Sequence, residues 1–230
     1  MSDATFTTPE RAAMLEGLLQ ERYSCRGYLR QPVPRETIDA MLRMAQRTAS
    51  WCNSQSWQVH VTGEAATQRL RDALLLHVMG HESKPDLDWP RYEGVYLQRR
   101  RECGFQLYNA TGVARADAEA ANRQRMENFR FFGAPHVLLV TTDAALGTYG
   151  AIDCGAYVNN FMLAARAHGL ASIAQAALAA FPDFWRKHLD LPETRNVVCG
   201  ISFGYEDAAH PANGFRTSRA LVEHATQFVE

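Results

Sequence analysis

The stretch from residue 149 to residue 168 constrains the fold more than any other part of this sequence. It is a predicted helix that is apolar on nearly all of its faces, so it must be covered by the protein core or by a second subunit. A membrane-spanning helix needs roughly 18 uninterrupted apolar residues, and the most apolar long stretch, Ile152–Leu170, falls short of that. The polar residues that interrupt it are Asp153, Asn159, Asn160, Arg166 and His168.

The composition fits a globular protein without a strong overall charge. The chain has 230 residues, a length that suits one domain with a long insertion or two small domains. Hydrophobic residues make up 47% and charged residues 21%, which argues against a disordered, collagen-like or coiled-coil protein. Lys and Arg number 24 against 25 Asp and Glu, a net charge of −1. No overall field therefore attracts nucleic acid or a membrane, and we predict neither partner.

The five cysteines indicate a reducing compartment. Their spacing is irregular, their number is odd and no two form a C-x-x-C pair, so we expect neither a disulfide framework nor a zinc ribbon. The first residues, Met1–Thr5, lack the basic start and the apolar run of a signal peptide. We therefore expect a cytoplasmic protein without a metal site.

Hydrophobic periodicity predicts an α+β protein in which helices dominate over a small sheet. Thr7 and Glu10 have the spacing of a capping box at the start of the first helix. Further helices are predicted over 34–47, 64–78, 95–110, 115–128, 149–168, 182–189 and after 218, and strands over 57–62, 136–142, 171–175 and 196–205. No linker or repeat divides the chain, so we predict a single domain, 1–230, with a helical insertion at about 80–128.

Two motifs resemble known chemistry but lack its context. Residues Gly200–Gly204 match G-x-S-x-G, with Asp207 and His224 in the right order for a hydrolase. A hydrolase serine needs a sharp strand-to-helix turn, whereas Ser202 falls inside a predicted strand, so this interpretation is the weaker one. His77 and His81 are four residues apart but lack the glutamate of H-E-x-x-H, which favours an ordinary surface pair.

The arginine run at 99–101 has no nucleic-acid-binding motif beside it, and a solvated helix face explains it. The sequence also contains neither G-x-G-x-x-G nor a Walker loop. If a nucleotide cofactor binds, the Rossmann fingerprint is not how it is held.

Three separate segments carry side chains suited to a phosphorylated heterocycle. In the first, Arg22, Ser24 and Arg26 alternate, so they share one face of an extended chain and can hold a phosphate. A solvated turn after a helix explains the same residues equally well. The second, 49–57, offers the amides of Asn53 and Gln55 for a heterocycle edge, although local capping also accounts for Ser50 and Asn53. The third, 213–219, adds arginines and hydroxyls before the last predicted helix.

Taken in order, these segments resemble the FMN-dependent nitroreductase family, and most closely its branch of para-nitrobenzoate and related nitroarene reductases. The resemblance covers nearly the whole chain. Its motifs are the R-x-S-x-R pattern at Arg22, Ser24 and Arg26, the loop 49–57, Phe131–Pro135, the helix Asp153–Gly169, Gly200–Tyr205 and the region Arg216–Arg219.

The resemblance implies an α+β sandwich with a small central mixed sheet flanked by helices, in an intertwined homodimer with FMN at the interface. The implied cofactor-binding segments include Cys25. Arg22, Ser24 and Arg219 would lie near the phosphate with Arg216 beside them, and Arg26 near the pyrimidine end of the flavin. Gln175 and Ala176 match a segment whose backbone faces the flavin N5. Further contacts, partly from the partner subunit, would come from Ser50, Asn53 and Gln55.

The activity implied is hydride transfer from NADH or NADPH through FMN to an electron-poor aromatic acceptor, a nitroarene or a quinone, by a ping-pong mechanism. FMN supplies the chemistry, so no catalytic side chain is expected. The insertion would cover the site. Trp51 would shape the substrate pocket by stacking, with core packing as an equal alternative. Dehalogenation, enone reduction and FMN binding without turnover remain the alternative functions.

Overall fold

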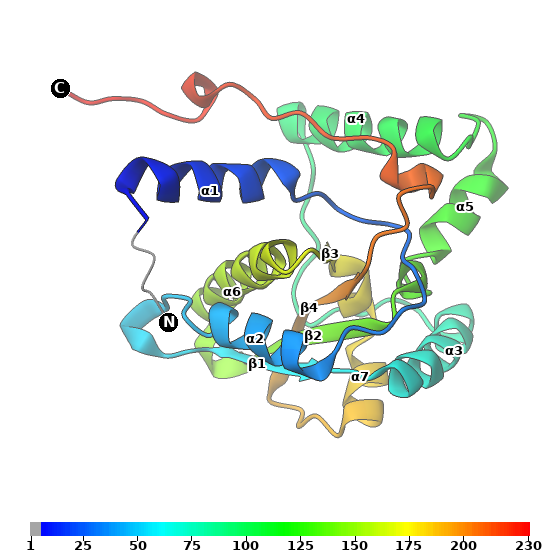
Figure 1. Ribbon diagram of the computed structural model, residues 1–230. Coiled ribbons are helices and arrows are strands. Elements are labelled where there is room, and N and C mark those ends of the chain that lie inside the picture. Colours follow the sequence, from blue (N-terminus) through cyan, green and yellow to red (C-terminus); the bar gives the residue numbers. More distant parts are fainter. Residues whose placement is uncertain (1–5) are drawn as a thin grey trace.

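The computed structural model describes residues 6–230, which surround a four-stranded sheet (Figure 1). The strands are β1 (Trp57–Val61), β2 (His136–Asp143), β3 (Ala171–Gln175) and β4 (Arg195–Gly204), and their order is β1-β2-β4-β3. Every neighbouring pair of these strands is antiparallel, so the predicted mixed sheet is wrong for them. The helical crossover from β2 does make β3 parallel to it, but β4 inserts between the two.

Helices cover both faces of the sheet, and β2 shows why. Successive side chains of a strand point to opposite faces. Leu138 and Val140 accordingly pack in one core cluster beneath α2 (Arg35–Ala45) and α6 (Gly147–Ala167). Val137 and Leu139 pack in a second cluster. This second cluster lies beneath α3 (Glu64–Gly80), the 3₁₀ turn Ala176–Ala180 and α7 (Pro182–Leu189).

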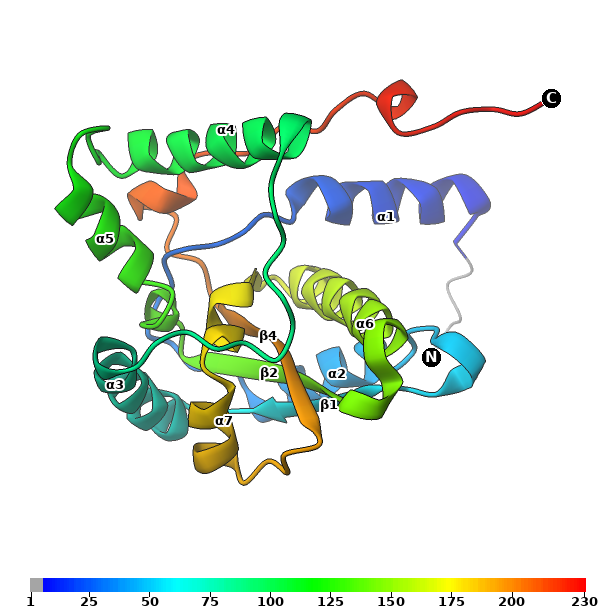
Figure 2. The same ribbon diagram turned by 180° about the vertical axis from the view of Figure 1, so that it is seen from behind.

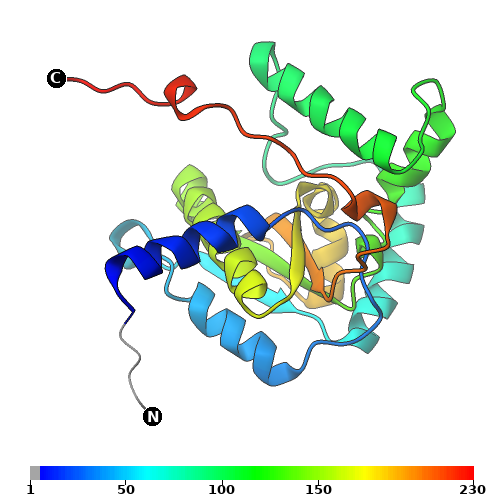
Figure 3. The ribbon, with the colours of Figure 1, turned by 45° about the horizontal axis from the view of Figure 1, so that its top comes forward.

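The remaining helices lie outside these two layers. Helix α1 (Thr8–Glu21) begins with the predicted capping box between Thr7 and Glu10 and lies across α6 (Figure 3). Helices α4 (Gly94–Ala110) and α5 (Ala118–Met126) stand away from the sheet (Figure 2). Across 6–230, no helix is long and apolar enough to cross a membrane.

The predicted helix after Ser218 is wrong. The chain beyond Gly214 is extended and contains only the 3₁₀ turn Val222–His224 before it ends (Figure 1). Leu221 and Val222 are exposed, so the apolar face that would stabilise a helix has nothing to pack against. The arginines of this segment therefore do not precede a helix N-terminus, whose dipole was expected to favour a bound anion.

The glycines of the G-x-S-x-G match serve close packing. A Cβ at Gly200 would lie 2.4 Å from Cδ1 of Leu178, and one at Gly204 would lie 2.7 Å from Cδ of Pro135. The first contact presses the turn Ala176–Ala180 onto β4. The two glycines of the motif are thus explained by the close approach of Leu178 and Pro135 to the backbone of β4.

We expect Gly200→Ala to destabilise the protein by about 1–3 kcal/mol, because the added methyl group overpacks the contact with Leu178. The free energy of unfolding in urea measures this loss. Gly17→Ala is the control, since no atom lies within 4 Å of a Cβ there and alanine favours the α1 helix. Equal stability of Gly200→Ala and the wild type would contradict the packing argument.

Candidate functional site

The first candidate segment leaves α1 and runs along the edge of the sheet. Arg22 ends the helix in an extended conformation, and Ser24 forms a parallel bridge with Ser172 of β3. The alternation that the sequence predicts is present: Cys25 is fully buried, whereas Ser24 and Arg26 are half-buried. The thiol of Cys25 donates to the carbonyl of Gly27 at 3.2 Å, so its side chain faces the core rather than a ligand.

Asn213 joins the third segment to the first. Its Oδ1 accepts the backbone N–H of Arg26 at 2.7 Å, and its Nδ2 donates to the carbonyl of Gly27 at 2.9 Å. As a result the guanidinium of Arg216 lies over the ring of Tyr23, 3.5 Å from its centre. Sequence reasoning did not identify Asn213 as a site residue, because its bonds to Arg26 and Gly27 span 187 and 186 positions of the chain.

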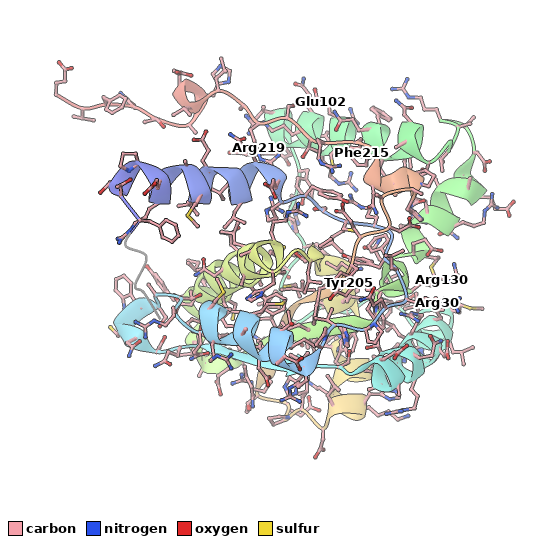
Figure 4. The ribbon with its side chains drawn as sticks, viewed as in Figure 1. Arg30, Glu102, Arg130, Tyr205, Phe215 and Arg219 are labelled. Carbon is pink, nitrogen blue, oxygen red and sulfur yellow. The ribbon has the colours of Figure 1, made fainter. Side chains whose placement is uncertain are left out.

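Four arginines from these two segments, Arg22, Arg26, Arg216 and Arg219, form what we call the arginine cluster. Within residues 6–230, none of the four is ion-paired with a carboxylate. Burial lowers the pKa of Arg22, and the positive charge of Arg219 lowers it further. Figure 4 shows Arg219 and Phe215 between α1 and α4. The cluster holds positive charge that a bound phosphate would neutralise.

The second segment forms a tight loop held by α6. Asp153 accepts the backbone N–H of Trp51 at 3.2 Å and the hydroxyl of Ser54 at 3.3 Å. The hydroxyl of Ser50 accepts the N–H of Gln55 at 2.9 Å, which is the local capping weighed above. The loop is bent by left-handed backbone at Cys52, Asn53 and Gln55.

Trp51 does not pack in the core of this chain. Its side chain is 66% exposed and contacts the ring of Tyr149, with the ring centres 5.3 Å apart. The core-packing alternative is therefore wrong within the chain, and the indole is available to another molecule.

One chain does not bring the loop and the arginine cluster together. The loop is attached to Asp153, near the start of α6. The last residue of α1, Glu21, pairs with Arg166 near the other end of α6, at 2.9 Å. Asp153 and Arg166 are 166 − 153 = 13 residues apart in one helix, which separates them by about 20 Å. The residues of the three candidate segments therefore fall into two groups, one at each end of α6.

Gln175 and Ala176 lie where β3 ends. The Gln175 side chain is buried, and its Nε2 donates to the carbonyl of Asn128 at 2.9 Å. Its Oε1 accepts the hydroxyl of Ser202. Ala176, in contrast, is exposed. The end of β3 thus presents Ala176 at the surface, while the Gln175 side chain is enclosed by the protein.

The hydrolase interpretation is wrong. Ser202 is fully buried within β4, and its hydroxyl is bonded to Gln175. His224 lies in the exposed C-terminal turn. The nucleophile therefore has neither the required turn nor access to a substrate.

Removing the carboxylate of Asp153 should loosen the loop. In Asp153→Ala, the N–H of Trp51 loses its acceptor, so we expect its hydrogen-exchange protection to fall by about 1–3 kcal/mol. Exchange of the Trp51 amide measures this change. Asp39→Ala, which removes an exposed ion pair of α2, is the matched control and should leave that amide unchanged. Unaltered protection in Asp153→Ala would show that the loop is held by other contacts.

The comparisons with known proteins agree with the fold. The Nitroreductase family profile matches residues 19–205. The nitroreductase NfnB of Mycolicibacterium smegmatis is 36% identical over 229 residues, which cover 97% of this chain and 96% of the relative. The 4-nitrobenzoate reductase of a Nocardioides species is 34% identical over 222 residues, covering 93% of this chain and 89% of the relative.

Solved structures give the same result. The crystal structure of the FMN-dependent nitroreductase NfnB from Mycobacterium smegmatis in complex with NADPH has a TM-score of 0.92 to this chain at 35% sequence identity. The match covers 96% of this chain and 100% of that one. Profile, sequence and structure thus agree over almost the full length, and the chain belongs to the nitroreductase family.

Proposed function

We propose that this protein is an FMN-dependent oxidoreductase that passes hydride from NADPH or NADH to an electron-poor aromatic acceptor. Nitroarenes are the acceptor class that we assign first, and quinones are the second. The observation that carries the proposal is the arginine cluster, whose two segments are joined through Asn213 and whose four arginines have no paired carboxylate in residues 6–230. The relatives support it, because one is an FMN-dependent enzyme in complex with NADPH and another is a 4-nitrobenzoate reductase.

The side chains of this site have binding and orienting roles. Bound FMN would supply the hydride chemistry by ping-pong exchange between donor and acceptor. Arg22, Ser24 and Arg219 would hold its phosphate, with Arg216 next to them. Arg26 would provide positive charge at the pyrimidine end, and the backbone of the exposed residue Ala176 would meet the ring. No side chain is assigned a proton-transfer role.

A homodimer completes this site. The loop residues Ser50, Asn53 and Gln55 lie at the opposite end of α6 from the arginine cluster, so the loop must come from a second subunit to reach the same cofactor. The surface supports this arrangement, because α1, α6 and the 3₁₀ turn Ala144–Leu146 before α6 leave large apolar side chains uncovered. These are Met14, Leu15, Leu19, Leu146, Tyr149 and Ile152.

The other assignments follow from this proposal. Residues 1–230 form one FMN-binding domain, with the segment 80–128 over the site and Trp51 in the pocket for a small aromatic acceptor. All five cysteines have free thiols, which supports a location in the cytoplasm. We assign no nucleic-acid or membrane partner.

FMN binding tests the arginine cluster directly. Loss of one charged phosphate contact in Arg22→Gln should weaken FMN binding by about 10- to 100-fold, as measured by flavin fluorescence titration. Arg35→Gln removes an exposed arginine of α2 and should bind FMN like the wild type. If the wild type takes up no FMN, the proposed function is wrong. Equal FMN affinities of Arg22→Gln and the wild type would instead remove Arg22 from the site.

Anaerobic reduction then tests the reaction. The visible flavin absorbance should bleach on addition of NADPH or NADH and return when a nitroarene such as 4-nitrobenzoate is added. Reoxidation by halogenated or enone compounds alone would assign the alternative reductive activities. Flavin that no acceptor reoxidises would indicate a protein that binds FMN without turnover.

A charge on the uncovered face of α6 should separate the subunits. In Ile152→Glu, burial of the carboxylate would oppose association, so we expect a monomer in sedimentation velocity together with weakened FMN binding. Leu76→Glu places the same charge at an exposed leucine of α3 and should leave the dimer intact. A dimer that persists in Ile152→Glu would place the interface elsewhere.

A further inference from the structure

Gln175 is the last residue of β3, and its carboxamide is enclosed by protein. Only 2% of the residue is exposed, and each end of the amide has a partner. The hydroxyl of Ser202 donates to Oε1, and Nε2 donates to the main-chain carbonyl of Asn128 at 2.9 Å. A buried amide must be hydrogen-bonded at both ends to avoid a large desolvation cost, so these two bonds fix the side chain.

Through Ser202 the network reaches the segment that begins the arginine cluster. The carbonyl of Ser202 accepts the hydroxyl of Tyr28 at 3.0 Å. The same hydroxyl lies 3.2 Å from the carbonyl of Cys25, which precedes Arg26. Tyr28, Cys25 and Ser202 are all buried. Buried and satisfied hydrogen bonds of this kind make the surrounding backbone rigid.

Through Asn128 the network reaches the segment that carries α4 and α5. Asn128 follows α5 and precedes the left-handed turn at Phe131 and Phe132. The contact uses the backbone carbonyl of Asn128, so the end of α5 is attached to the end of β3. Any displacement of α5 relative to the sheet must break or move this bond.

The other end of the same segment is attached to the same region. The backbone N–H of Lys84 donates to the carbonyl of Ala180 at 2.9 Å. Asp86 pairs with Arg186 at 2.8 Å and accepts the N–H of Val197 at 2.8 Å. Figure 2 shows this part of the chain crossing the sheet before it rises to α4. Both attachments therefore lie between the last residue of β3 and the first residues of β4.

We propose that Gln175 is a positioning residue that couples the α4–α5 segment to the backbone at Ala176. Its carboxamide holds the end of β3 in register with Asn128, so that a change in the position of α5, such as a bound acceptor would cause, is transmitted to the edge that meets the flavin. The coupling is a property of the chain itself. Its effect on the flavin rests on the proposed function.

Two replacements of Gln175 separate hydrogen bonding from packing. Gln175→Glu keeps the shape and the acceptor for Ser202 but places an oxygen against the Asn128 carbonyl. Gln175→Met keeps a similar volume and removes both bonds. Gln20→Met is the matched control, because it makes the same replacement at an exposed glutamine of α1 that bonds only Glu16. Ser202→Ala, a small change in β4, provides a second variant should replacement of Gln175 prevent folding.

Hydrogen exchange on the full chain without added FMN measures the coupling between the α4–α5 segment and Ala176 separately from any effect on the flavin. We expect exchange in residues 118–132 and 176–180 to accelerate together by about tenfold in Gln175→Glu and Gln175→Met, and less in Ser202→Ala, with Gln20→Met like the wild type. If Gln175→Met exchanges like the wild type in both regions, Gln175 serves only packing and the proposal is overturned.

The FMN-bound enzyme reads the effect on the site. We expect the visible flavin spectrum and midpoint potential to shift in both Gln175 variants, and kcat to fall about tenfold with little change in the KM for NADPH. Wild-type spectrum, potential and kcat in these variants would overturn the link to the flavin. Failure of the wild type to bind FMN would overturn the proposed function, while the exchange measurement still decides the coupling.

Discussion

The antiparallel pairing of β2 with β4 supports everything else in this structure. The two strands pair from His136 with Phe203 to Asp143 with Arg195, and helices cover both of their faces. Because both strands are largely buried, their registers are fixed by packing as well as by hydrogen bonds. β4 in turn aligns β3, so that Ser202 reaches Gln175, and Gly200 admits Leu178. The position of the exposed residue Ala176 is thus set by the two buried central strands, β2 and β4.

In contrast to these buried strands, the arginine cluster carries charges that no carboxylate within residues 6–230 neutralises. Its guanidinium groups hydrogen-bond to neutral carbonyls: Arg26 to Ser24, and Arg216 to Asn213. Such bonds fix direction without neutralising charge, so the segment keeps a net positive field at its surface. Burial and the charge of Arg219 lower the pKa of Arg22 from its ordinary value. A guanidinium nevertheless stays protonated at neutral pH, so the charge is retained. The chain therefore maintains local repulsion, which an anionic ligand would relieve.

Local signals predicted much of the fold. The predicted bounds of α7 and β3 agree with the observed bounds to the residue, and the predicted capping box at Thr7 and Glu10 is present. Each of these features depends on neighbours within a few positions of the chain. The predicted helix after Ser218 failed since helical propensity there lacks a packing partner. Strand neighbours could not be deduced, because insertion of β4 between β2 and β3 is a non-local outcome. The site followed the same division. The R-x-S-x-R alternation was predictable, whereas the roles of Asn213, Asp153 and Asn128 depend on contacts between distant segments.

The length of α6 has a genetic consequence. Under the proposed two-fold arrangement, each cofactor would be held by the arginines of one subunit and the loop of the other. A subunit damaged only at Arg22 and a subunit damaged only at the loop would then pair to give one fully intact site and one doubly defective site. Two inactive alleles of this kind would complement each other in a single cell. Two alleles damaged at the same end of α6 would not.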